Sequence, residues 1–134
     1  MELQLNKTGD IFDLELKNSL NETIELNASS SIGGKDQGFR PMELLAGSLA
    51  GCSSIDILNI LNKQKIRPDS FDVTINATRK DEVPAIFERI HLEFFVSEEV
   101  PREKLVRAIE LSMEKYCSVT KILEPTCIIT YSIG

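Results

Sequence analysis

Hydrophobic and polar residues alternate through the first part of the chain, in three short runs separated by polar turns. The runs cover residues 2–5, 11–16 and 22–26. Alternation with a period of two is typical of strands that bury one face and leave the other in water. The pattern therefore predicts an antiparallel meander of three strands. Residues 28–38, which are rich in Ser, Gly, Lys and Asp, predict a loop.

Between residues 40 and 66 the pattern changes to a helix that is apolar almost all round. Pro41 suits the first helical turn, and Pro68 follows the predicted end. Gly47 and Gly51 lie four residues apart, and each costs about 1 kcal/mol relative to alanine inside a helix. A close approach by another backbone would offset that cost. We therefore expect a central helix, crossed by a second helix beside Cys52.

The second half of the chain alternates between strand and helix signals. Leu105, Ile109 and Met113 recur at four-residue spacing and predict the buried stripe of a second helix. Helices that pack against sheets in this order predict the α+β class, with antiparallel sheets and two main helices in a single domain over residues 1–134. The expected elements are strands at 71–77, 86–96 and 126–133, a helix from 102 to about 115, and a helical turn at 119–123.

Composition narrows the classes of function. The chain has 134 residues and a net charge of −6, which argues against nucleic acid or an anionic membrane as a partner. Its start resembles no signal peptide, and its apolar runs look too short to span a membrane. A cytoplasmic location follows as the default. Three cysteines in such a compartment are expected to be buried thiols, metal ligands or redox groups rather than a disulfide framework.

Three segments carry a resemblance to a known family. They are Pro-Met-Glu-Leu-Leu at 41–45, Gly-Cys-Ser-Ser-Ile-Asp at 51–56 and Glu-Lys-Tyr-Cys-Ser-Val at 114–119. Together they resemble the OsmC/Ohr family of thiol-dependent peroxidases, and in particular its YhfA-like branch, from about residue 30 onward. The resemblance implies the OsmC-like fold and an intertwined homodimer. In that dimer the two central helices cross at the interface, and each of two sites holds a cysteine pair.

The resemblance also implies a reaction. Cys52 would attack a small-molecule hydroperoxide, and Cys117 would resolve the sulfenic acid as a disulfide that an external dithiol reduces. No cofactor is implied. The peroxidases use an N-terminal arginine and a glutamate ten residues before the cysteine, but here Met42 holds that position and no arginine precedes Arg40. Arg40 and Glu43 are the candidates for these roles, with Arg79 and Arg89 as alternative cations. A non-catalytic small-molecule-binding or redox-sensing module is the alternative function.

The remaining candidates have simpler interpretations. Asp56, one helical turn after Cys52, is either a helix-to-helix hydrogen-bond partner or a site residue. His91 is expected to be a structural residue of a strand, and Cys127 a core residue of the last strand. A zinc site is not favoured, because no two cysteines have the C-x-x-C spacing of such sites.

Overall fold

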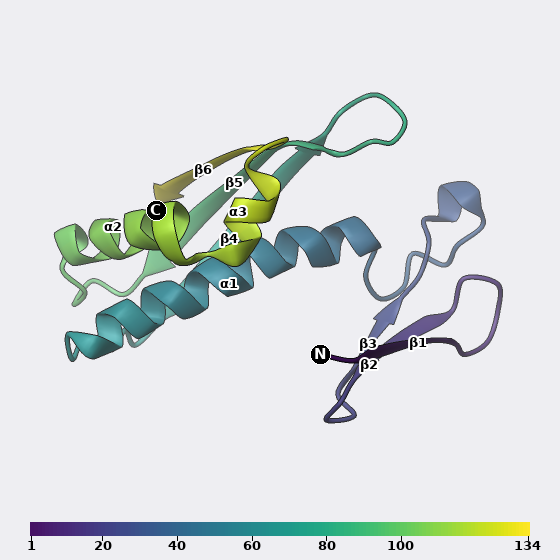
Figure 1. The fold of residues 1–134 in the computed structure, drawn as a ribbon, viewed down its shortest axis with the longest axis horizontal. Helices are drawn as coiled ribbons and strands as arrows, with labels where there is room; N and C mark the ends of the chain where they lie inside the picture. Colours follow the sequence, from purple (N-terminus) through teal and green to yellow (C-terminus); the bar gives the residue numbers. More distant parts are fainter. The chain divides into compact units, whose positions relative to one another are not determined.

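The computed structural model describes all residues 1–134 and confirms the α+β class. The chain forms two compact units, residues 1–45 and residues 46–134, which are described separately below. The expectation of a single domain over residues 1–134 stays a prediction. Figure 1 labels the strands and helices in chain order.

The first unit is built on an antiparallel sheet of β1 (Leu3–Lys7), β2 (Leu14–Asn18) and β3 (Thr23–Leu26), in that order. Leu5, Leu16 and Ile24 lie opposite one another across the sheet, so its apolar side chains share one face. Leu5 is 57% exposed, and no part of this unit covers the face. The second strand begins at residue 14, three residues later than predicted.

The late start of β2 follows from the turn before it. The backbone N–H of Thr8 donates to the Asp13 carbonyl over 2.9 Å, and the Asp13 carboxylate accepts the N–H of Asp10 over 2.9 Å. These bonds close a turn that includes Ile11 and Phe12, although both residues fit the alternating pattern. Local hydrogen bonding by an aspartate thus outweighs the alternating pattern that predicts a strand here.

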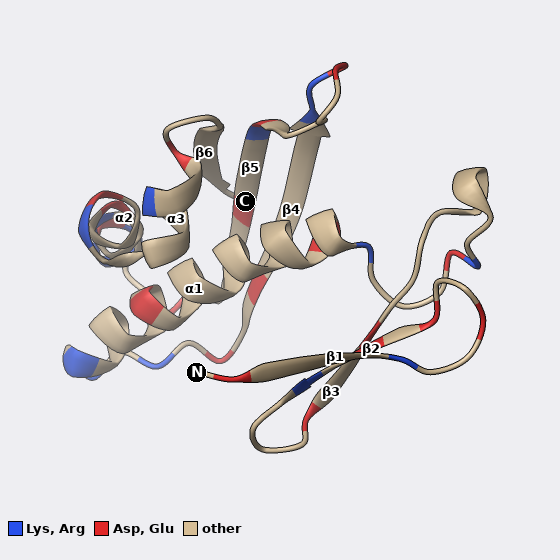
Figure 2. Cartoon of the chain, turned by 45° about the vertical axis from the view of Figure 1, so that its right-hand side comes forward, with Lys and Arg blue, Asp and Glu red and all other residues tan.

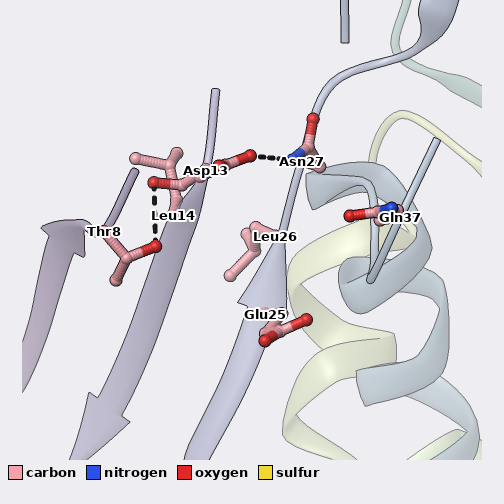
Figure 3. Close-up of a pocket in the computed structure, with 7 residues that line it drawn as sticks. All are labelled: Thr8, Asp13, Leu14, Glu25, Leu26, Asn27 and Gln37. Carbon is pink, nitrogen blue, oxygen red and sulfur yellow. Dashed lines mark hydrogen bonds between the residues drawn. The ribbon is translucent and has the colours of Figure 1, made fainter. Parts of the chain in front are cut away.

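Residues 28–38 form the expected loop, with a short 3-10 helix, η1 (Ser30–Ile32). Asn27 organises its start by donating to Asp13 over 2.8 Å and accepting the Lys35 N–H over 3.1 Å, and Lys35 also pairs with Asp13 over 2.9 Å. The Lys35 hydrogen bond is the main cause that holds the pKa of Asp13 below its usual value. Figure 3 shows Asp13 and Asn27 beside a small polar cavity of about 130 Å³.

Helix α1 (Pro41–Lys63) confirms the predicted central helix. It begins in the first unit, and its residues 46–63 belong to the second. Its length of 23 residues and a mean hydropathy of 1.6 over an 18-residue window would allow it to span a membrane, so the expectation that no apolar run reaches that length is wrong. A single helix of this kind is weak support for a membrane span, because core helices of soluble proteins have the same composition.

The second unit contains a sheet of β4 (Phe71–Arg79), β5 (Phe87–Val96) and β6 (Ile128–Ile133), with β5 in the middle. The β4–β5 pair is antiparallel, but the β5–β6 pair is parallel, which the expectation of antiparallel sheets did not include. The parallel pair arises because the chain crosses over through two helices between these strands. In Figures 1 and 2 the helices lie on one side of the sheet. The fully buried residues Ile90, Leu92 and Phe94 alternate along β5.

The crossover contains α2 (Arg102–Leu111), the π-helical segment η2 (Ser112–Tyr116) and α3 (Ser118–Leu123). The predicted second helix is therefore confirmed, but its last turn is wider than an α-helix. Leu105 and Ile109 form its buried stripe, as predicted. Cys117 is the single residue between the end of the π segment and the start of α3.

Candidate active site

Cys52 and Asp56 are presented by the middle of α1. They lie four residues apart, which places their side chains on the same face of a helix. Both side chains are partly buried. Between them the fully buried Ser53 donates from its hydroxyl to the carbonyls of Leu49 and Ala50, over 2.9 and 3.1 Å. These bonds lie within α1, and the complete burial of Ser53 shows that the turn beside Cys52 packs against the rest of the second unit.

Cys117 is held at the junction of η2 and α3. Its backbone N–H donates to the Ser112 carbonyl over 2.8 Å, the i to i−5 bond that closes the π turn. Its sulfur accepts the Thr120 N–H over 3.4 Å and so caps the first turn of α3. The side chain is 0% exposed. Two helical segments thus fix the position of this sulfur from both sides.

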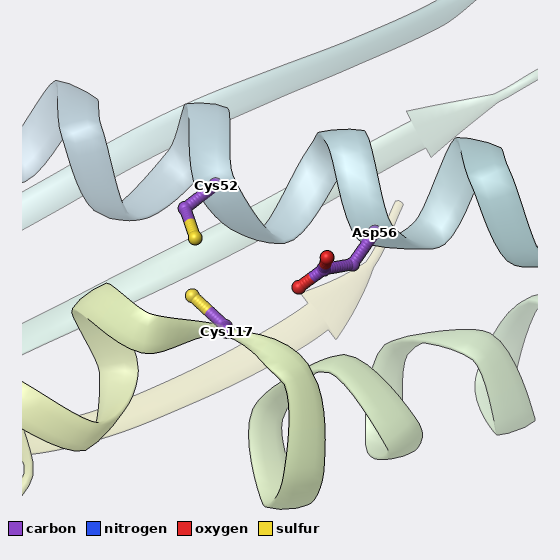
Figure 4. A group of neighbouring side chains, drawn as sticks. All are labelled: Cys52, Asp56 and Cys117. Carbon is purple, nitrogen blue, oxygen red and sulfur yellow. The ribbon is translucent and has the colours of Figure 1, made fainter.

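The two cysteines and Asp56 meet between α1 and the η2–α3 junction. One Asp56 carboxylate oxygen and the two sulfurs all lie within 4.8 Å of one another. Figure 4 shows the sulfurs of Cys52 and Cys117 pointing toward each other, with the carboxylate beside them. The Ser112 hydroxyl donates to Asp56 Oδ2 over 3.1 Å. Asp56 is thus a helix-to-helix hydrogen-bond partner and lies beside the thiol pair, while its role as a site residue stays a prediction.

The two thiols differ in their burial and in their access to solvent. Burial raises the pKa of the Cys117 thiol above its usual value, and the nearby Cys52 raises it further, while the hydrogen bond from Thr120 offsets part of this rise. Cys117 is therefore a neutral thiol at pH 7, and solvent does not reach it. Cys52 is partly exposed and is the sulfur that an external molecule can approach.

A cavity of about 340 Å³ adjoins Asp56. Ile60 and Leu111 give it apolar walls, while Lys63 and Tyr116 add polar groups. It lies along the C-terminal half of α1, on the side where Asp56 faces η2. Neither cysteine lines this cavity, so Asp56 is the residue that connects it with the thiol pair.

Comparison with known proteins agrees with this geometry. Residues 34–132 match the sequence profile of the family described as OsmC-like protein. The chain belongs to the OsmC-like family. It is 37% identical over 98 residues to Protein YhfA of Escherichia coli K12, an alignment that covers 72% of this chain and 73% of YhfA.

Solved structures share the fold of this chain. A hypothetical protein from Aquifex aeolicus VF5 has a TM-score of 0.81 at 27% identity, with 99% of this chain and 95% of that chain covered. An organic hydroperoxide resistance protein OsmC from Legionella pneumophila has a TM-score of 0.75 at 14% identity, with the same shares covered. OhrB of Bacillus subtilis, an organic hydroperoxide resistance protein, has a TM-score of 0.67 at 15% identity, with 100% and 98% covered. The resemblance of the sequence to the OsmC/Ohr family is thus confirmed.

Arg40 and Glu43, the two other predicted site residues of this OsmC-like chain, lie in the first unit. The Arg40 guanidinium donates to the carbonyls of Gln37 and Gly38 over 2.6 and 2.8 Å. Glu43 accepts the Arg40 backbone N–H over 3.0 Å and thereby caps the start of α1. These contacts give both residues a structural role. Their action at the thiol pair stays a prediction.

His91 and Cys127 lie in surroundings that give them a structural role. The two ring nitrogens of His91 lie 2.8 Å from Thr130 Oγ1 and 2.9 Å from Ser132 Oγ, so the ring joins β5 to β6 as a structural residue. Cys127 is buried, as expected of a core residue, although it immediately precedes β6 instead of lying within it. Burial raises the pKa of its thiol.

Ser112 and Thr120 contact the thiol site, although the sequence does not predict them there. Ser112 lies three residues after Ile109 and is fully buried, so it continues the apolar stripe of α2 with a hydroxyl. A polar residue at such a position was the available signal. The contribution of Thr120 comes from its backbone N–H, for which no residue type gives a signal.

Proposed function

We propose that this OsmC-like protein is a cysteine-based peroxidase that reduces organic hydroperoxides through Cys52 and Cys117. The observation that supports this most is the placement of the two sulfurs within 4.8 Å of each other, although 64 residues separate them in the chain. A disulfide requires a sulfur–sulfur bond of about 2.05 Å, so a movement of at most about 2.8 Å at the η2–α3 junction would join them. The names of the Legionella and Bacillus structural relatives point to the same substrate class.

The proposed reaction has three steps. The Cys52 thiolate attacks the outer oxygen of the hydroperoxide, the O–O bond breaks, and the alcohol leaves after taking a proton from water, which gives Cys52 sulfenic acid. The Cys117 thiol then attacks that sulfur, and a disulfide and water form. An external dithiol transfers two electrons to the disulfide and restores both thiols.

The difference in burial supports this assignment of roles. The attacking sulfur must be reached by the O–O bond, and of the two only Cys52 is exposed to solvent. The resolving sulfur needs to meet only the neighbouring sulfenic acid. Its burial and raised pKa keep Cys117 from reacting first.

We expect cumene hydroperoxide to be reduced at least tenfold faster than hydrogen peroxide. Placing part of its ring in the cavity beside Asp56 would bury about 100 Å² of apolar surface, and at about 25 cal/mol per Å² this gives up to about seventyfold. The measurement is kcat/KM for each hydroperoxide at one dithiol concentration. Equal or reversed values would argue against the apolar substrate class.

A variant pair refines this test. Ile60→Asn changes a wall of the cavity and should lower kcat/KM for cumene hydroperoxide while leaving the value for hydrogen peroxide unchanged. Ile122→Asn is the matched control, because Ile122 is 73% exposed on α3 and is not part of the cavity wall. If both variants lose activity equally, the cavity does not bind the substrate.

One observation favours the alternative function, a binding or redox-sensing module without turnover. No charged residue lies on α1 between Glu43 and Asp56, and Figure 2 shows this stretch without blue segments. Within residues 46–134, no lysine or arginine forms an ion pair with Asp56. A carboxylate without a cation opposes negative charge on the neighbouring sulfur. A folded, reduced protein that consumes neither hydroperoxide would favour this alternative.

We also propose that the protein assembles as a homodimer through the glycine face of α1, defined as Gly47, Gly51 and Ile55. A Cβ built at either glycine meets no atom within 4 Å, and Ile55 is 71% exposed. The chain itself therefore leaves open the close approach that offsets the cost of two mid-helix glycines. The uncovered apolar face of the β1–β2–β3 sheet is a second surface that a partner could bury.

A further inference from the structure

We infer that the reduced site binds a zinc ion through Cys52, Asp56 and Cys117. The inference goes beyond peroxidase chemistry: it requires both thiols to be reduced, but it does not require that the protein turn over a hydroperoxide. It also departs from our expectation from the sequence, which considered only the short cysteine spacing of common zinc sites.

The geometry of the three ligand atoms fits a single ion. A triangle whose sides do not exceed 4.8 Å contains a point within about 2.8 Å of all three corners, since that radius is the side divided by √3. Zinc lies about 2.3 Å from a thiolate sulfur and about 2.0–2.2 Å from a carboxylate oxygen. Each ligand atom would therefore need to move inward by only about 0.5–0.8 Å.

The chemistry of the donors favours zinc among the common metal ions. Two thiolates select soft or borderline ions and disfavour Mg²⁺ and Ca²⁺, which bind oxygen. The carboxylate makes the set less suitable for Cu(I), which prefers sulfur alone. Three protein ligands leave a fourth tetrahedral position open to water or to an external ligand, as in zinc sites that are not purely structural.

The surroundings supply the supporting hydrogen bonds that metal ligands usually have. Ser112 donates to Asp56 Oδ2 over 3.1 Å, which orients the carboxylate while leaving lone pairs on both oxygens. The Thr120 N–H donates to the Cys117 sulfur over 3.4 Å, an arrangement that stabilises a thiolate. Both donors belong to the η2–α3 region.

Charge balance supports the same conclusion. When the ion binds, both thiols lose their protons, so two thiolates and a carboxylate place three negative charges in a largely buried cluster, where their mutual repulsion is strong. No lysine or arginine of residues 46–134 forms an ion pair with Asp56. A divalent cation at the centre would offset two of these charges and bind all three groups.

The sequence does not reveal this site, because two of its ligands are neighbours on one helix and the third lies far away in the chain. Cys52 and Asp56 lie four residues apart on one helix, which brings them to the same face, whereas Cys117 is distant in the chain. A search for short cysteine pairs cannot find such a set.

Cobalt(II) titration of the reduced full-length protein without oxygen tests the inference, because Co²⁺ replaces zinc and reports its ligands by absorption. We expect one Co²⁺ per chain, with a thiolate-to-cobalt charge-transfer band and intense visible bands of tetrahedral cobalt, and displacement by Zn²⁺. Cys117→Ser should abolish the charge-transfer band or reduce it to that of one thiolate. A folded, reduced wild-type protein without the band would overturn the inference, whether or not the protein is a peroxidase.

Two further variants test the role of the carboxylate and its support. Asp56→Asn keeps the size of the side chain and an acceptor for Ser112, and it should weaken Zn²⁺ binding by at least about a hundredfold. Ser112→Ala should weaken it by about tenfold with the same cobalt spectrum. Cys127→Ser is the matched control and should bind normally, since Cys127 lies outside the cluster. Unchanged affinity in Asp56→Asn would overturn the assignment of the third ligand.

Discussion

Replacing Cys52 with serine is expected to lower the rate of dithiol-dependent cumene hydroperoxide reduction by about a thousandfold or more. A serine hydroxyl at this position is not ionised at neutral pH and is a poor nucleophile toward oxygen, so the first step of the reaction is lost. The fold should be kept, because the cysteine side chain is partly exposed and the substitution changes one atom. The measurement is kcat/KM for the variant and the wild type.

Cys117→Ser and Cys127→Ser complete this series. Without Cys117, the Cys52 sulfenic acid has no neighbouring thiol, and excess hydroperoxide should convert it to sulfinic acid that mass spectrometry detects. Cys127→Ser is the control and should keep most of the wild-type activity, because Cys127 is not part of the cluster. If the Cys52→Ser protein retains a comparable rate, Cys52 is not the nucleophile.

Replacing Gly51 with leucine is expected to separate the dimer while leaving each chain folded. Within the chain a Cβ at Gly51 meets no atom within 4 Å, and leucine favours the helix more than glycine does. In a two-fold dimer the added side chain appears twice, so overpacking that costs about 1–3 kcal/mol each would weaken association by at least about thirtyfold. Sedimentation analysis over a range of concentrations measures this constant.

Lys104→Leu is the matched control for the assembly. Lys104 is an exposed position of α2 without an ion pair, so the substitution adds the same side chain to a different helix surface. We expect this variant to associate as the wild type does. A Gly51→Leu protein with an unchanged dimer, or a wild-type protein that is monomeric at all concentrations, would contradict the proposed interface.

The elements of this fold could largely be predicted because periodicity reports which face of a segment is buried. The alternation in β5 and the spacing of Leu105 and Ile109 in α2 are examples, and both are confirmed. The prediction misplaces the start of β2 because the hydrogen bonds of Asp13 with Thr8 and Asp10 decide it. The Asp13 carboxylate also contacts the distant residues Asn27 and Lys35. The parallel pairing of β5 and β6 is not visible in either strand, since the crossover determines it.

The site was predictable only in part. The resemblance to the family identified Cys52 and Cys117. The residues around either cysteine do not predict that the other lies next to it. The π turn at η2 places the Ser112 hydroxyl against Asp56 and Cys117 against Cys52, and a helical pattern does not predict where such a turn occurs. Arg40 and Glu43 were proposed from the family alone, and their hydrogen bonds lie within the first unit.

Peptide mapping after oxidation is the most direct test of the proposed thiol chemistry. Reduced protein receives one equivalent of cumene hydroperoxide, the remaining thiols are alkylated, and the digest is analysed by mass spectrometry. We expect one linked peptide that joins Cys52 to Cys117 and disappears with dithiothreitol, while Cys127 is recovered alkylated. If Cys52 remains fully alkylatable even after excess hydroperoxide, the thiol pair is not a peroxidase site.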